Sequence, residues 1–305
     1  MSDVNLAVDL GGLAMKNPVT TASGTFASGK EYADFFDIRE LGAVTTKGVS
    51  LNGWAGNDSP RIAETPSGML NSIGLQNPGV EAFMQRDLAW LATQDVPVIV
   101  NVSGHSFSEY VEVIEALEGS QTVSAYEVNI SCPNVDEGGM TIGTDPASVE
   151  RVVSLCRSAT KRPLIVKLSP NVTDICEIAR AACAGGADAL SLINTLLGMA
   201  VNAHTRTPQL ARVVGGLSGP AIKPVALRMV WQVHQAVEVP LFGAAYYRGD
   251  LNEDDTIDVE DANVLINIIL KKTSDNWPKL SDMNGDGVVD IDDLSALINI
   301  MLHKS

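Results

Sequence analysis

The sequence has few cysteines, few basic residues and no long apolar run. Its 305 residues include 4 cysteines, too few for the disulfide framework that holds small secreted domains together. With 21 basic and 37 acidic residues the formal net charge is −16, opposite in sign to that expected of a nucleic-acid-binding protein. No run approaches the roughly 18 apolar residues that span a bilayer, and the first residues do not resemble a secretory signal. We therefore expect a cytoplasmic globular protein that binds neither nucleic acid nor membrane.

The acidic residues are concentrated near the end of the chain. Residues 250–305 hold 13 acidic and 4 basic side chains, a net charge of −9, whereas all four cysteines come earlier. This change in composition predicts two domains, residues 1–248 and residues 249–305.

The first of these domains alternates short apolar runs with longer amphipathic segments. This alternation predicts parallel strands joined by helices, in a doubly wound sheet or a (β/α)₈ barrel, and we favour the barrel. Seven strands are expected, and an eighth is missing, so the predicted fold is a (β/α)₈ TIM barrel truncated after its seventh strand. The expected strands are Val19–Ala22, Ala43–Lys47, Val98–Ser103, Ala125–Ile130, Leu164–Leu168, Ala189–Asn194 and Val239–Gly243, and the expected helices include Val80–Thr93, Ser108–Leu117, Pro146–Ser158 and Val172–Ala184.

Polar residues recur where the expected strands end. Barrel active sites lie at the carboxyl ends of the strands, so a ring of such residues predicts a site rather than ordinary polar loops. The residues in question are Ser23, Lys47, Asn101, Asn129, Lys167 and Asn194.

Four motifs give this domain a resemblance to a known family. They are ASGTF at Ala22–Phe26, NSIGLQNPG at Asn71–Gly79, NISCPN at Asn129–Asn134 and GGLSGPA at Gly215–Ala221. In this order they resemble class 1 dihydroorotate dehydrogenase, and most of all its B-type catalytic subunit, over residues 1–243. The resemblance implies an FMN-binding (β/α)₈ barrel that oxidises dihydroorotate to orotate in pyrimidine biosynthesis.

The resemblance also implies a role for each motif residue. Cys132 is the expected catalytic base, because a partly ionised thiol can take a proton from carbon; the alternative is a buried core cysteine, as we expect for Cys156, Cys176 and Cys183. Lys167 would stabilise negative charge on the reduced flavin. The expected cofactor-binding residues are Ser23, Lys47, Gly48, Asn101, Asn129, Lys167, Ile193 and Gly219. The expected substrate-binding residues are Lys47, Asn71, Ser72, Ile73, Gly74, Leu75, Asn129, Asn194 and Thr195.

The same resemblance implies partner subunits, and it shows one place where this sequence differs from the family pattern. The B-type subunit works with an electron-transfer subunit that carries FAD and an iron–sulfur cluster and passes electrons to NAD, as a homodimer within a hetero-oligomer when the barrel is complete. Ala245 and Tyr246 stand where the family has a glycine pair beside the FMN phosphate. Side chains there obstruct the close approach that glycine allows.

Residues 249–305 contain a repeat with a period of 32 residues. Leu265–Ile268 recurs as Leu297–Ile300, and each copy follows a 12-residue loop with acidic or amide side chains at calcium-ligand spacing. The first loop carries Asp255 where the second has the turn glycine, Gly287, so weaker binding is expected there. The expected Ca²⁺ ligands are Asp250, Asn252, Asp254, the carbonyl of Thr256, Asp258 and Asp261, then Asp282, Asn284, Asp286, the carbonyl of Val288, Asp290 and Asp293.

This repeat resembles a dockerin, a small all-α module with paired calcium loops that binds a cohesin domain. An acidic solvated tail does not account for two loops in register, and a paired EF-hand would need entering helices. Two functions therefore remain open: a flavin-dependent dihydroorotate dehydrogenase, or an inactive barrel fragment carried by a dockerin that binds cohesin when calcium is present.

Overall fold

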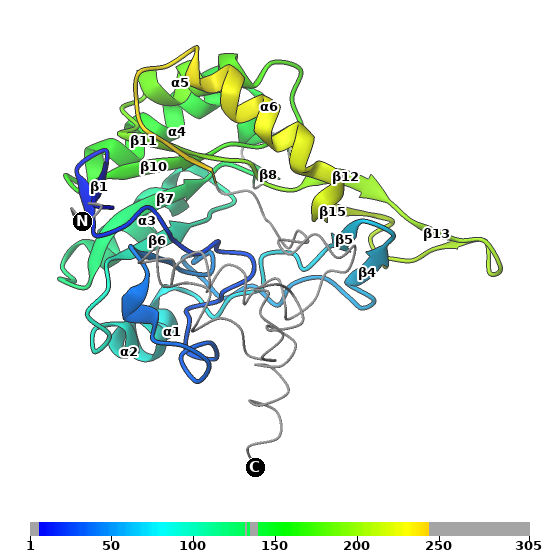
Figure 1. Ribbon diagram of the computed structural model, residues 1–305, viewed down its shortest axis with the longest axis horizontal. Helices are drawn as coiled ribbons and strands as arrows, with labels where there is room; N and C mark the ends of the chain where they lie inside the picture. The colour runs from blue at the N-terminus through cyan, green and yellow to red at the C-terminus, as the bar shows by residue number, and fades with distance from the viewer. Residues whose placement is uncertain (1–5, 132, 135–139, 244–305) are drawn as a thin grey trace, which may run out of the picture.

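The computed structural model describes residues 6–131, 133–134 and 140–243. Their largest element is a six-stranded parallel sheet in the order β16-β11-β10-β7-β6-β3, in which every neighbouring pair is parallel (Figure 1). Together with its helices, this sheet is part of a barrel wall. The strands are β3 Val44–Thr45, β6 Val98–Val102, β7 Val123–Asn129, β10 Leu164–Lys167, β11 Ala189–Leu192 and β16 Leu241–Gly243.

The helices follow the strands in the expected alternation, and three begin with a side-chain cap. Ser106, Asp145 and Asp174 each accept a hydrogen bond from a backbone N–H in the first turn of the helix that follows, which satisfies donors that the helix itself leaves unpaired. The helices are α1 Val80–Phe83, which continues through a π-helical turn at Met84–Leu88 into α2 Ala89–Leu91, then α3 Phe107–Glu118, α4 Pro146–Ala159, α5 Ile175–Ala184 and α6 Lys223–His234. Short 3₁₀ turns lie at Ile38–Glu40, Ile142–Thr144 and Pro220–Ile222.

The sheet is buried on both faces. One face packs against the helices, with Tyr126 and Val128 of β7 in the large apolar cluster. The alternate residues, such as Ala125, join a second cluster inside the barrel, because successive side chains on a strand point to opposite faces. Burial on both sides explains why these strands read as continuous apolar runs in the sequence.

A hairpin closes the amino-terminal end of this interior. Its strands, β1 Val8–Leu10 and β2 Leu13–Met15, place Leu10, Leu13 and Met15 in the inner cluster. The turn needs glycine: Gly11 has a φ of +62°, and a Cβ there would lie 2.7 Å from the carbonyl carbon of Asp188.

A separate antiparallel sheet lies beside the parallel one, in the order β12-β15-β5-β4 (Figure 1). None of the strands expected from the sequence belongs to this sheet. Its strands are β4 Ile62–Thr65, β5 Gly68–Asn71, β12 Leu196–Met199 and β15 Val214–Ser218. Two short strand pairs complete the described elements, β13 Val201–Asn202 with β14 Thr207–Pro208, and β8 Pro133–Asn134 with β9 Met140–Thr141.

The parallel order of the strands confirms much of the predicted architecture, with one difference. The expected first strand, Val19–Ala22, contributes to the sheet through a single bridge between Thr20 and Ala43, because its other backbone groups pair in turns and with side chains. The second domain and all of its expected Ca²⁺ ligands lie outside the described residues. Within the described residues, no helix is long and apolar enough to cross a membrane.

Candidate active site

A cavity of about 420 Å³ opens at the carboxyl ends of the parallel strands, where the antiparallel sheet approaches them. It collects residues from segments far apart in the sequence, as the ring of polar strand ends predicts. Of the expected site residues, the following line it: Ser23, Lys47, Gly48, Asn71, Ser72, Ile73, Gly74, Leu75, Asn101, Asn129, Asn194 and Thr195.

Three expected site residues lie outside the lining of this cavity, and one lies outside the described residues. Lys167 is 1% exposed and reaches the site through Ser23, whose Oγ is 3.2 Å from the lysine Nζ. Ile193 is fully buried, and Gly219 precedes the 3₁₀ turn at Pro220 with a φ of +108°. Cys132, the expected base, is the residue that the structure does not describe.

The structure adds lining residues that the sequence analysis did not assign. Gly24, Thr25 and Ser131 belong to motifs quoted above. Their position in the sequence beside expected site residues is the signal that could have identified them. Ile62, Met69 and Ser218 come from the antiparallel sheet. Ser218 belongs to the quoted motif Gly215–Ala221, whereas Ile62 and Met69 lie outside the quoted motifs. Sequence spacing offers no signal that Met69 and Ser218 meet, because the pairing of β5 with β15 joins residues about 150 positions apart.

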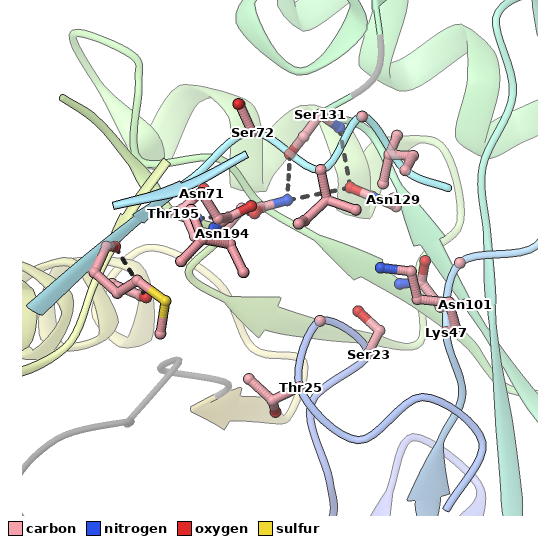
Figure 2. Close-up of a pocket in the computed structure, with 18 residues that line it drawn as sticks. Ser23, Thr25, Lys47, Asn71, Ser72, Asn101, Asn129, Ser131, Asn194 and Thr195 are labelled. Carbon is pink, nitrogen blue, oxygen red and sulfur yellow. Dashed lines mark hydrogen bonds between the residues drawn. The ribbon is translucent and has the colours of Figure 1, made fainter. Parts of the chain in front are cut away.

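Amide side chains at one wall of the cavity hold one another in place. The Asn194 Nδ2 donates to Ser131 Oγ at 2.8 Å and to Asn129 Oδ1 at 3.3 Å, and these bonds are drawn in Figure 2. The backbone N–H of Thr195 donates to Asn194 Oδ1 at 2.8 Å. The orientation of the Asn194 amide is therefore fixed before any ligand binds, which lowers the entropy that binding must remove.

The antiparallel sheet supplies the opposite wall. Asn71, at the end of β5, donates from Nδ2 to the carbonyl oxygen of Gly216 in β15 at 3.3 Å. The neighbouring Ser72 has a buried hydroxyl with no hydrogen-bond partner in the described part of the chain. Buried polar groups are normally paired, so this hydroxyl indicates a polar ligand.

A second pair of unpartnered polar atoms lies near the base of the cavity. Asn101 Oδ1 and Ser103 Oγ are buried and have no partner among the described residues. Both lie next to Gly48, where a Cβ would be 2.9 Å from Asn101 Oδ1 and 3.0 Å from Ser103 Oγ. Glycine at this position leaves the space beside these atoms open.

The described cysteines are structural. Burial raises the pKa of the Cys156 thiol to about 12, and burial likewise raises the pKa of Cys176 and of Cys183. All three are free thiols; Cys156 is buried in the main apolar cluster, as the sequence predicts, whereas Cys176 and Cys183 are half-buried and pack against it. A thiol with a raised pKa is neutral near pH 7 and is a poor nucleophile or base.

No group of three metal-binding side chains occurs within residues 6–131, 133–134 and 140–243. The expected Ca²⁺ ligands all lie beyond this range, so the calcium prediction concerns the second domain alone.

Comparisons with known proteins match two parts of the chain to two different families. Residues 5–245 match the family model for dihydroorotate dehydrogenase, and residues 248–302 match the model for the dockerin type I domain. Proteins named dihydroorotate dehydrogenase B (NAD(+)), catalytic subunit, are 59% identical in Alkaliphilus oremlandii, 57% in Alkaliphilus metalliredigens and 58% in Geotalea uraniireducens. Each match extends over 243 residues, 80% of this chain and 80% of the relative.

Proposed function

Because the chain belongs to the dihydroorotate dehydrogenase family, we propose that it oxidises dihydroorotate to orotate in pyrimidine biosynthesis, with FMN as the hydride acceptor. The observation that carries this proposal is the cavity itself. It brings the Asn71–Leu75 motif, Asn129, Asn194 and Thr195 together around one volume. A planar, amide-rich carboxylate needs side chains that both donate and accept, and amides do so.

The residues at the base of the cavity fit a flavin. The unpartnered Asn101 Oδ1 offers a hydrogen bond to a polar ring, and Gly48 leaves the room that the ring would occupy. Lys167 lies behind Ser23 and contributes positive charge there. When bound, FMN supplies the acceptor for a hydride from the substrate. The residues proposed to hold it are Ser23, Lys47, Gly48, Asn101, Asn129, Lys167, Ile193 and Gly219.

The chain's own residues perform the other half of the reaction. Forming the ring double bond removes a proton from one carbon and a hydride from its neighbour, and Cys132 is the proposed base for the proton. A thiol with a pKa near 8.5 must be partly ionised by its surroundings to act at neutral pH. Asn71, Asn129, Asn194 and Thr195 orient the substrate, and Lys47 supplies charge for the substrate carboxylate.

The second family match supports a second activity for the same chain. Residues 249–305 are proposed to form a separate calcium-binding domain that docks onto a cohesin domain, because residues 248–302 match the dockerin model. The relatives are named as an NAD(+)-dependent enzyme's catalytic subunit, which supports a separate electron-transfer partner that passes electrons to NAD. We propose, from the family resemblance, that this partner carries FAD and an iron–sulfur cluster. A cytoplasmic location follows from this biosynthetic role.

The test is orotate formation by the full chain with saturating FMN and an artificial electron acceptor. Cys132→Ala is expected to abolish turnover and to leave FMN binding intact. Cys183→Ala is the matched control, because this thiol packs in the core away from the cavity. Undiminished turnover of Cys132→Ala at about pH 8 would contradict the assignment of the base.

A further inference from the structure

A buried carboxylate inside the barrel has no part in the function proposed above. Glu127 lies in the middle of β7, is 2% exposed and does not line the cavity. Placing a carboxylate in such a position costs free energy unless hydrogen bonds compensate for the lost water.

The position of Glu127 follows from strand periodicity. Ile99, Ala125 and Ala189 form the inner apolar cluster, and side chains two residues further along a strand point to the same face. Asn101, Glu127 and Ser191 are those next residues on β6, β7 and β11, and Lys167 follows Ile165 of the same cluster on β10, so the four form a polar layer between the apolar interior and the cavity.

Both carboxylate oxygens of Glu127 are used within this layer. Asn101 Nδ2 donates to Oε2 at 2.5 Å, and Ser191 Oγ donates to Oε1 at 2.8 Å. The two contacts therefore connect β6 and β11 through the side chain of the strand β7.

The contact with Asn101 decides which end of its amide faces the cofactor side. The Asn101 Nδ2 donates to Glu127 Oε2, so the NH₂ group of Asn101 faces the Glu127 side chain. The amide oxygen is then directed away from Glu127, and it is this Oδ1 that is buried and unpartnered beside Gly48. An apolar residue at position 127 would leave the two amide orientations nearly equal in energy.

We propose that Glu127 is a positioning residue that fixes the Asn101 amide so that its oxygen accepts a hydrogen bond from a donor group of the bound flavin. This inference rests on the proposed function. It explains why the barrel keeps a hydrogen-bond acceptor at this depth, since an apolar side chain of similar size would fill the space without imposing an orientation.

The first test measures FMN affinity of the full chain by quenching of flavin fluorescence. Glu127→Met removes the acceptor at similar volume and is expected to raise the Kd about tenfold, the loss of one hydrogen bond to a buried partner. Glu127→Gln retains an oxygen that can accept from Asn101 and an NH₂ that can donate to Ser191, so its Kd stays within about threefold of the unmodified value. Ser191→Ala, the matched control, leaves the Asn101 contact in place and is expected to behave like Glu127→Gln.

A double-mutant cycle separates positioning from general structural support. In an Asn101→Ala background, Glu127→Met is expected to cause no further loss of affinity, because there is no amide left to orient. An equal loss in both backgrounds, or no loss in either, would overturn the proposal.

A measurement on the flavin-free chain keeps the inference independent of FMN binding and of the folding of the variants. With ¹⁵N-labelled asparagine, the Asn101 side-chain amide signals are assigned by their absence in Asn101→Ala. Their exchange with solvent is expected to be at least about 100-fold slower than that of the exposed Asn202. Equal exchange rates would refute the orienting role, whereas absent FMN quenching by the unmodified chain would count against the proposed function instead.

Discussion

Some residues around the cavity pack so closely that a larger side chain at one position would displace its neighbour. Thr195 lines the cavity just before β12, and Gly216 of β15 lies against its side chain. A Cβ on Gly216 would lie 2.6 Å from the Cβ of Thr195, and a β-branched side chain has few rotamers with which to move away. Glycine at position 216 therefore leaves the space that Thr195, a proposed substrate-binding residue, occupies.

Gly216→Ala is expected to displace Thr195 and to weaken substrate binding. Overpacking of this kind costs about 1–3 kcal/mol, so the KM for dihydroorotate should rise on the order of tenfold with the fold retained. Gly119→Ala is the matched control, because a Cβ there has no neighbour within 4 Å. Unchanged steady-state kinetics of Gly216→Ala would show that Thr195 does not contact the substrate.

Among the helices, α4 has the most clearly defined beginning. Asp145 accepts a hydrogen bond from the backbone N–H of Ser148 at 2.8 Å, and Pro146 stands at the first helical position, where its missing N–H is not needed. Hydrogen bonds from the side chain and backbone of Ser148 hold the pKa of Asp145 below its ordinary value of 3.8. The cap is therefore charged at neutral pH and stabilises the positive end of the helix dipole.

Asp145→Ala is expected to lower the free energy of unfolding by about 1 kcal/mol, the usual cost of losing a cap. Because the pKa is lowered in the folded state, this stabilisation is fully present above 3.8 and is lost as the pH falls through the folded pKa. Urea unfolding should therefore show the same difference at about pH 7 and pH 5. Asp34→Ala, at an exposed position outside any helix, should leave stability unchanged; equal midpoints for Asp145→Ala and the unmodified chain would contradict the capping role.

At the scale of the whole molecule, the parts of the chain that match two different families are separated by only a short segment. The dehydrogenase match ends at residue 245 and the dockerin match begins at residue 248. The strand β16 ends two residues before the first of these positions, and in the described sheet it has a neighbour on one side, β11. The loops after the last two strands of a barrel commonly bind the cofactor phosphate, and beyond residue 247 this sequence matches a different family.

We therefore expect the purified chain to bind FMN weakly. The polar groups around Gly48 are present, but the glycine pair expected beside the phosphate is replaced by Ala245 and Tyr246. An edge strand with unpaired backbone groups also favours aggregation. Absorption spectroscopy and gel filtration check this; a yellow, monomeric protein with one FMN per chain would contradict it.

Calcium is expected to drive folding of the segment 249–305. Its loops concentrate carboxylates that repel one another without a cation, and a segment of this length can bury only a small apolar core. A ligand that binds only the folded form stabilises that form, so circular dichroism should show helix gained with calcium and lost with chelator. Asp282→Ala should reduce the response more than Asp250→Ala, because Asp255 already compromises the first loop; a spectrum indifferent to calcium would exclude the module.

The sequence by itself determined the family, the parallel order of the strands and most of the cavity. These features depend on local patterns: apolar runs buried on both faces, polar residues at strand ends and motifs such as Asn71–Gly79. Only the tertiary structure decided the antiparallel sheet that places Met69 and Ser218 in the cavity, because its strands pair across about 150 residues. It also decided the role inferred for Glu127, which in the sequence is one polar residue within a buried strand. Its contacts with Asn101 and Ser191 arise only when β6, β7, β10 and β11 are packed in one sheet, so that Glu127 reaches a neighbouring strand on one side and the next strand but one on the other.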